Sequence, residues 1–408
     1  MSVELEALKR IAVYEEPNGS FAVDGSATPA NFLDVPIMEG SASWSAGRQF
    51  QQKNTLQQYS YQFDSVVQGW KRPTLKFKMH LAPNGTAANS STASLSSSVV
   101  AVQRILKAVM GGEGAGSQGS AVSGAPTSAA VFAVTAGHGS RFTNKQAVGL
   151  VDTNNVCEVR ELVSKATDTL TLYHRGSFTP ANGSAVYNSA SYYITDSPDT
   201  SLQFIVEGKE QDDRWVLQGM QCTSFAIDLP NDGFPTVEME FTGVYFAALS
   251  SAAITGATYS NFDPQWKAHK TFTAPYSAAG DQTATSQCTQ ARMFDPKIAF
   301  EPLFCPSATY GVERYYKKRT EPVQAKITLP YQDTSWFTAA DAGTEYYLSQ
   351  QYGSAAGKTV TVVIRRAIAI DVNRVGDTFA QQEVTFQAGH VTNSSTDLSR
   401  TPIAIHFV

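Results

Sequence analysis

The order of short sequence motifs in the first half of the chain occurs again in the second half, and this repetition limits the fold more than any other feature. Each motif belongs to a segment that resembles a β-strand or leads into one. The matches are Trp70–Pro73 with Lys317–Arg319 and Pro322, Lys78–Leu81 with Lys326–Leu329, Ala226–Asp228 with Ala369–Asp371, Gly233 with Gly376, and Phe241 with Phe386. One fold used twice explains this repetition, and two unrelated β domains are the alternative.

The distance between matched motifs is larger early in the chain than late in it. The offset is 326 − 78 = 248 for the early motif, and 371 − 228 = 143 and 386 − 241 = 145 for the later ones. The first half therefore contains 248 − 143 = 105 extra residues, the size of a small subdomain. We place this insertion at residues 111–201, because the Gly/Ser/Ala-rich stretch Gly111–Thr127 predicts a flexible linker there.

A chain of 408 residues exceeds the length at which one hydrophobic core stops growing, so several domains are expected. We predict a first module from residues 1–110 and 202–250, and an inserted outer β subdomain with its Gly/Ser linker at 111–201. A connector arm at 251–287 then leads to a second module at 288–408. The loop-like composition of 250–287 is the reason for the connector.

Alternation of apolar and polar residues predicts a mainly β protein. The clearest strands are Arg72–Leu81, with Leu75, Phe77, Met79 and Leu81 on one face, and the segments around Val237, Met239 and Phe241 and around Val384 and Phe386. Shorter strands are expected in the insertion at Ala130–Val134, Cys157–Val163, Thr169–His174 and Tyr192–Thr195. One helix is expected in each half, at 92–110 ending before Gly111 and at 336–351.

The charge balance excludes several classes of protein. With 31 basic and 36 acidic side chains the chain lacks the cationic surface of an ordinary nucleic-acid-binding protein. No apolar run is long enough to span a membrane, and Met1–Glu6 does not resemble a signal peptide. We therefore expect a protein that stays on the cytosolic side.

Cysteine and histidine spacing predicts no metal site. Cys157, Cys222, Cys288 and Cys305 are expected to be free thiols, with a bridge between Cys288 and Cys305 as the one pairing worth testing. The histidines are scattered without the spacing of metal ligands or of a catalytic triad: His80, His138, His174, His269, His390 and His406.

Two glycine-rich stretches resemble nucleotide-binding loops without meeting their requirements. Gly353–Thr359 has three residues between its glycines where a P-loop has four, and it leads into a strand, Thr359–Ile364, instead of a helix. Gly114–Gly119 has dinucleotide-binding spacing but follows a helix. We expect no cofactor.

Two charged clusters have a functional and a structural interpretation. Glu207, Glu210, Asp212 and Asp213 could be glycosidase carboxylates or calcium ligands, but they lie between two apolar runs, as the tip of a hairpin does. Glu313–Glu321 could contact another subunit or a nucleic acid, and a solvated hairpin is the simpler explanation. The sequence thus predicts no enzyme, with no catalytic, cofactor-binding or metal-binding residue.

Several segments resemble the major tail tube proteins of long-tailed, siphovirus-like bacteriophages. They are Gly19–Gly25, Asp34–Gly40, Ile105–Gly111, and the strand pair Gln221–Asp228 and Thr236–Gly243, whose pattern recurs in the C-terminal half. The resemblance covers most of the chain outside the insertion. It implies two tail-tube modules, each a β-sandwich with a barrel-forming sheet and one helix.

The resemblance also implies a structural role in the virion. Six modules make one ring of such a tube, so three two-module chains would close a pseudo-sixfold ring, and a homohexamer is the alternative. Rings stack into the channel for DNA ejection, and the implied partners are the tape measure, tail terminator and distal tail proteins. DNA would pass without specific binding, and Glu238, Glu240 and Glu383 are candidates for the channel wall or for a solvated exterior face.

Two alternatives to these expectations stay open. The chain could be another virion β protein, such as a capsid decoration or distal tail component. It could also be a glycan-binding or glycan-hydrolysing β-sandwich that uses the acidic cluster near Asp212. We further expect the insertion to lie outside the tube and to be dispensable for assembly.

Overall fold

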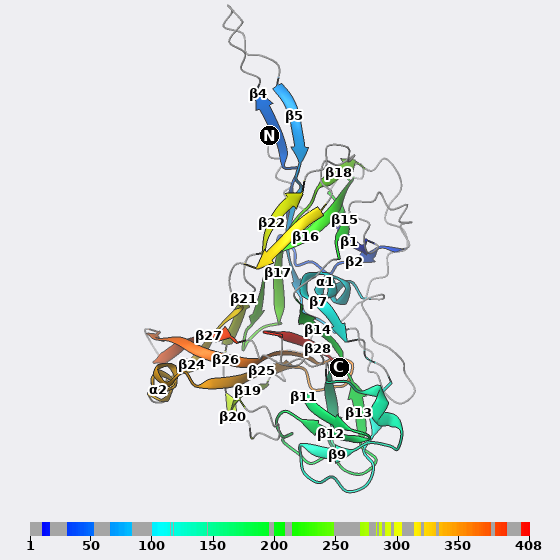
Figure 1. Ribbon diagram of the computed structural model, residues 1–408, viewed down its shortest axis with the longest axis vertical. Helices are drawn as coiled ribbons and strands as arrows, with labels where there is room; N and C mark the ends of the chain where they lie inside the picture. The colour runs from blue at the N-terminus through cyan, green and yellow to red at the C-terminus, as the bar shows by residue number, and fades with distance from the viewer. Residues whose placement is uncertain are drawn as a thin grey trace, which may run out of the picture.

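The computed structural model describes residues 10–16, 31–52, 66–83, 100–114, 116, 118–144, 146–195, 200–208, 214–248, 270–276, 283, 285–287, 290–294, 298–303, 314–319, 322–331, 334–376, 380–389 and 401–408. Within these residues the fold is mainly β, as the alternation predicts, with two α-helices (Figure 1). All the strand pairs of the main sheet are antiparallel.

The first half supplies ten strands and one helix among the described residues. They are β1 (Arg10–Glu15), β2 (Leu33–Asp34), β3 (Ser43–Ser45), β4 (Arg48–Gln52), β5 (Val66–Lys71), β6 (Thr74–His80), α1 (Ala101–Met110), β15 (Leu202–Glu207), β16 (Arg214–Leu229), β17 (Thr236–Thr242) and β18 (Tyr245–Ala248).

The second half supplies the same number of elements among its described residues. They are β19 (Lys270–Pro275), β20 (Thr285–Gln287), β21 (Gln290–Phe294), β22 (Ile298–Leu303), β23 (Arg314–Arg319), β24 (Gln324–Pro330), α2 (Ser335–Ala342), β25 (Glu345–Tyr352), β26 (Val360–Val375), β27 (Gln381–Ala388) and β28 (Ala404–Phe407).

Strand pairing follows the same order in both halves. The pairs β1–β2, β1–β15, β3–β6, β4–β5, β6–β17, β15–β16, β16–β17 and β16–β18 have the counterparts β19–β20, β19–β25, β21–β24, β22–β23, β24–β27, β25–β26, β26–β27 and β26–β28. The helix also has the same place, between β6 and β15 and between β24 and β25. Duplication from a common origin stays a prediction, but the two halves share one topology.

Residue pairing corrects the register of the sequence matches. Leu75 and Ala325 lie opposite Phe241 and Phe386, so the offset in these strands is 325 − 75 = 250, not 248. The partners of the same two phenylalanines in the long strands are Cys222 and Ala369, an offset of 369 − 222 = 147, not 143. The offsets taken from the sequence thus differ from those in the structure by 2 and by 4 residues, both even numbers. An even shift keeps every side chain on the same face, so alternation identifies the strands without fixing their register.

The insertion lies between α1 and β15, as the offsets indicate. Its elements are β7 (Gly111–Gly114), β8 (Ser120–Ala121), β9 (Val131–Ala133), the 3₁₀ helix η2 (His138–Arg141), β10 (Ala147–Val151), β11 (Cys157–Ala166), β12 (Thr169–Leu172), β13 (Ala185–Asn188) and β14 (Ala190–Ile194). Six of these strands form a separate sheet, in the order β8-β13-β10-β11-β12-β9, with its own hydrophobic core (Figure 1).

The predicted flexible linker is wrong for the residues that the structure describes. Strand β7 pairs with β14, and β14 pairs with β28, so this segment extends the sheet of the second half. A Cβ at Gly112 would lie 2.3 Å from the ring of Tyr193, and a Cβ at Gly116 would lie 3.1 Å from the backbone of Ser189. Glycine here allows close packing of a strand, a use that composition cannot distinguish from a linker.

Two other sequence predictions need correction. The second helix ends at Ala342, where Gly343 has a φ of 63°, and the rest of the predicted helix is strand β25, held between β19 and β26. The predicted connector at 251–287 contains β19 and β20, which pair with the second half as β1 and β2 pair with the first. Tertiary pairing outweighs local propensity at both places.

One hydrophobic core runs through both halves. Helix α1 buries Val102, Ile105, Leu106 and Val109 in it and ends at Gly111, which has a φ of 87°. Residues 92–99 of the predicted helix lie outside the described residues. The strand residues predicted to share a face are buried in the same core: Leu75, Phe77, Met79, Leu81, Val237, Met239, Phe241, Val384 and Phe386.

Candidate functional site

Eight strands from the two halves form one continuous sheet. Its order is β3–β6–β17–β16–β21–β24–β27–β26, and β21 is the strand that joins the halves. On one edge β21 pairs with β16, where Ala226 lies opposite Phe294. On its other edge it pairs with β24, where Lys326 lies opposite Arg292. A surface on this sheet therefore extends over both halves of the chain.

The two faces of this sheet differ in chemistry. One face packs in the hydrophobic core. Because side chains alternate between faces, the residues between the core positions gather on the other face. We call it the polar face, and among the described side chains its charged residues are Lys76, Lys78, Asp228, Glu238, Glu240, Lys326, Asp371 and Glu383.

Each lysine of the polar face has a carboxylate partner. Lys78 lies 3.1 Å from Asp228, which fixes β6 to β16 across β17. Lys76 lies 2.6 Å from Glu238, and its hydrogen bond to this carboxylate raises the pKa of the lysine. These partly exposed pairs contribute at most about 1 kcal/mol each. Their main effect is electrostatic, because they neutralise the cations of the face.

The pair in the first half has a counterpart in the second. Lys326 lies 3.2 Å from Glu383, and these residues take the register positions of Lys76 and Glu238. Among the described charged side chains of the polar face, three lysines stand against five carboxylates, so these side chains carry a net negative charge. Such a face repels phosphates instead of holding them.

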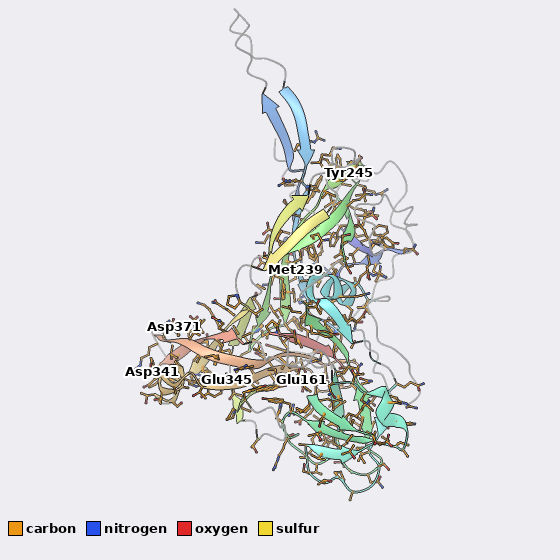
Figure 2. The ribbon with its side chains drawn as sticks, viewed as in Figure 1. Glu161, Met239, Tyr245, Asp341, Glu345 and Asp371 are labelled. Carbon is orange, nitrogen blue, oxygen red and sulfur yellow. The ribbon has the colours of Figure 1, made fainter. Side chains whose placement is uncertain are left out.

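A second cluster joins the insertion to the second half and is almost completely buried. Arg365 Nε donates to Glu161 Oε2 over 3.1 Å, and Arg365 Nη2 donates to the carbonyl of Leu162 over 3.2 Å. His406 Nε2 donates to Glu161 Oε1 over 3.0 Å, and its Nδ1 lies 2.8 Å from Ser191 Oγ. Figure 2 labels Glu161 where the inserted sheet meets the second half.

Its two buried partners keep the Glu161 carboxyl ionised. Burial by itself raises the pKa of the Glu161 carboxyl. Arg365 and His406 lower it by more than burial raises it, so the resulting pKa is about 2. Side chains that are 5% exposed or less surround a carboxylate whose two oxygens both accept hydrogen bonds. The cluster fixes the insertion on the second half, contrary to the predicted flexible attachment.

The pKa of Glu161 predicts a stability loss in acid. The folded value of about 2 lies below the ordinary value of 4.5, so Glu161 stabilises the fold above pH 4.5, and this contribution disappears as the pH falls toward 2. It amounts to about 3 kcal/mol at neutral pH. The stability difference between the native chain and Glu161→Gln should shrink as the pH falls below 4.5. Urea unfolding at a series of pH values measures it, and an unchanged difference at pH 3 would contradict the prediction.

The loop that resembles a P-loop also serves this junction. It is the turn between β25 and β26, and the strand that follows it is confirmed. The carbonyl of Ser354 accepts the backbone N–H of Cys157, and Gln351 exchanges hydrogen bonds with Cys157 and Val159 of the insertion. Burial raises the pKa of Cys157 to about 12, which leaves the thiol unreactive.

The other predicted candidates do not converge on a reactive site among the residues that the structure describes. Glu207 lies at the end of the β15–β16 hairpin, 3.1 Å from Arg214, and Glu210, Asp212 and Asp213 lie outside the described residues. The described part of the charged cluster, Arg314–Arg319, is strand β23 and pairs antiparallel with β22. Among the residues described, no three histidine, cysteine, aspartate or glutamate side chains are placed to hold a metal ion.

The histidines and cysteines have separate surroundings. His138 lies 3.0 Å from Ser120 Oγ, and burial lowers the pKa values of His80 and His174. Cys222 is buried, and its Sγ donates to the carbonyl of Ser224 over 3.3 Å. His269, His390, Cys288 and Cys305 lie outside the described residues, so the suggested bridge stays a prediction. His406 differs from the expectation of isolated histidines, since it belongs to the buried cluster.

Comparisons with known proteins give no match from which a function could be taken, so the function has to be inferred from the geometry of the described residues. No protein-family model and no curated protein matches the sequence. No helix in the described part of the chain is long and apolar enough to cross a membrane.

Proposed function

We propose that the chain is the subunit of a phage tail tube, in which three copies form a ring of six modules and the rings stack around a channel for DNA. The observation that carries this proposal is the sheet of eight strands. It uses both halves of one chain side by side in the same topology, with β21 connecting them. A unit that already joins two equivalent modules edge to edge needs only further copies to close a ring.

The size of a closed barrel supports a channel. Three chains with eight strands each give 24 strands. With strands about 4.8 Å apart and tilted by about 40°, such a barrel has a backbone diameter of about 50 Å. Barrels of 16 to 18 strands already enclose an aqueous channel, so this one would enclose a wider one.

The polar face has the charge that a channel wall needs. Its lysines are paired with carboxylates, and an excess of carboxylates remains. A wall of this kind lets DNA slide because, among the described side chains, each lysine is already paired with a carboxylate. In this proposal Glu238, Glu240 and Glu383 face the lumen, and the core face with its helices lies outside it.

Mass measurement combined with negative-stain microscopy tests the proposal. A ring of three chains has a mass of 3 × 44.0 = 132 kDa, and we expect rings and stacked tubes as the protein concentration rises. A ring of 6 × 44.0 = 264 kDa would keep the tube and change its stoichiometry. Particles that form one closed oligomer without stacking would favour another virion protein, and a monomer at every concentration and salt would contradict the proposal.

A further inference from the structure

The joint between the two halves is an ordinary antiparallel strand pair with a defined register. Strand β21 pairs with the C-terminal end of β16, and the opposed residues are Ala226 with Phe294, Ile227 with Met293, Asp228 with Arg292, and Leu229 with Ala291. Strand β15 pairs with the same edge of β16, but only with residues nearer the N-terminal end of β16. The C-terminal end of β16 is therefore the edge that receives the next module.

The counterpart of β21 in the first half is β3. Each precedes a hairpin, and each pairs with the strand that follows that hairpin. Lys76 lies opposite Ser43, and Lys326, which has the register position of Lys76, lies opposite Arg292. Strand β21 is paired on both edges, whereas β3 pairs only with β6 in the part of the chain that the structure describes.

The counterpart of the receiving edge of β16 is the C-terminal end of β26. Asn373 lies opposite Glu383 as Ala226 lies opposite Glu238, so Asn373–Gly376 take the positions of Ala226–Leu229. Strand β25 pairs with β26 only as far as Ile368, and the described residues supply no partner for this edge beyond it. Asn373, Arg374 and Gly376 are exposed there (Figure 2 labels the neighbouring Asp371).

Within the part of the chain that the structure describes, the sheet thus ends in two unpaired edges that match the two sides of its internal joint. Unpaired edges invite strand addition, and here both belong to the same sheet at opposite ends. We propose that β3 of one copy pairs antiparallel with the C-terminal end of β26 of a second copy, in the register of the β16–β21 joint. This inference rests on the proposed tube and specifies its chain-to-chain contact.

The register of the contact follows when each residue of β16 in the internal joint is replaced by its equivalent in β26, and each residue of β21 by its equivalent in β3. Ser45 lies opposite Asn373, Trp44 opposite Arg374, Ser43 opposite Val375, and Ala42 opposite Gly376. Ser43 and Val375 correspond to Arg292 and Asp228, so their side chains lie on the polar face of the joined sheet. Three of these four pairs contain no charged residue, so the contact should persist at high salt.

A disulfide across the contact tests the register. Directly opposed residues of antiparallel strands have Cα atoms about 4.5 to 5.5 Å apart, within the range of a disulfide. We expect Ser43→Cys combined with Val375→Cys to form chain-to-chain disulfides on oxidation of the assembled protein. Covalent dimers and trimers up to 132 kDa should appear without reductant, and 44.0 kDa chains with it. Ser45→Cys with Asn373→Cys provides a second pair in the same register.

The matched control shifts one cysteine along the same strand. In Ser43→Cys with Asp371→Cys, the two Cα atoms are displaced by four residues, about 13 Å along the strand, which is too far for a disulfide. The single variants and the native chain, which has four cysteines of its own, give the background.

The outcomes separate this inference from the proposed function. Rings that cross-link in both in-register pairs but not in the control support the contact. Rings in which neither in-register pair cross-links, or in which the control cross-links equally, overturn the contact and leave the tube proposal standing. A folded chain that stays monomeric by mass overturns both.

Discussion

Replacing Arg365 by alanine is expected to lower the free energy of unfolding by about 3–5 kcal/mol. The substitution removes the guanidinium that donates to Glu161 and to the carbonyl of Leu162, and it leaves a carboxylate that is almost fully buried beside His406 alone. An uncompensated buried charge costs far more than an exposed one, because water cannot reach it. Urea or thermal unfolding followed by circular dichroism measures the loss.

The neighbouring arginine provides a control with the same chemistry and different burial. Arg366 pairs with Glu345, and both side chains are more than a quarter exposed. We expect Arg366→Ala to cost at most about 1 kcal/mol. Equal losses in the two variants would show that burial of the Glu161 cluster does not determine its contribution.

A variant in which the whole cluster is apolar shows why Arg365→Ala is less stable. It separates the cost of leaving Glu161 without its arginine partner from the cost of losing the arginine side chain itself. Replacing Glu161, Arg365 and His406 together by leucine, methionine and phenylalanine removes every charge at once. Buried ion pairs are often replaced by apolar residues at little cost. We expect this triple variant to be clearly more stable than Arg365→Ala alone.

The sequence predicted those parts of the fold that depend on alternation within one strand. Leu75, Phe77 and Met79 have the predicted face, and the match of Phe241 with Phe386 is correct in the structure. Alternation has a period of two residues, so a shift by two or four leaves it unchanged. This is why the repeat was visible in the sequence and the offsets of 248 and 143 were wrong.

The buried cluster could not be predicted, because its members are distant in the sequence. Glu161 is 204 residues from Arg365 and 245 from His406, and each is an ordinary polar residue in its own strand. Only the pairing of β14 with β28 brings the insertion to the C-terminal strand. A single sequence gives no signal for such a contact.

The polar face was predictable in part. Glu238, Glu240 and Glu383 were identified as candidates from their position between apolar strand residues, and the structure places all three on one face of one sheet. The pairing of Lys76 with Glu238 and of Lys326 with Glu383 was not predicted, since it requires the register across strands. Their position in a lumen stays a prediction.

Removing the inserted six-stranded sheet is expected to destabilise the second half, a consequence that the sequence-based expectation of a sheet dispensable for assembly did not include. Residues 115–190 can be replaced by Asn-Gly, because Gly114 and Ser191 lie directly opposite each other and a two-residue turn can connect them. The deletion keeps β7 and most of β14 but removes Glu161, which leaves Arg365 and His406 without their carboxylate. We expect a loss at least as large as that of Arg365→Ala, or about 2–4 °C in melting temperature for each kcal/mol.

A second substitution in the deleted chain separates the loss of this ionic contact from other effects of the deletion. Arg365→Met breaks no ion pair with Glu161 in the deleted chain, so it should change the melting temperature of that chain little, whereas in the full chain it should lower the melting temperature by leaving Glu161 with His406 alone. This difference between the two chains is the expected result only if the insertion and the second half share one electrostatic contact. A deleted chain that melts at the native temperature and assembles normally would show that the insertion is an independent appendage. In that case the Glu161 cluster would contribute nothing to the stability of the second half.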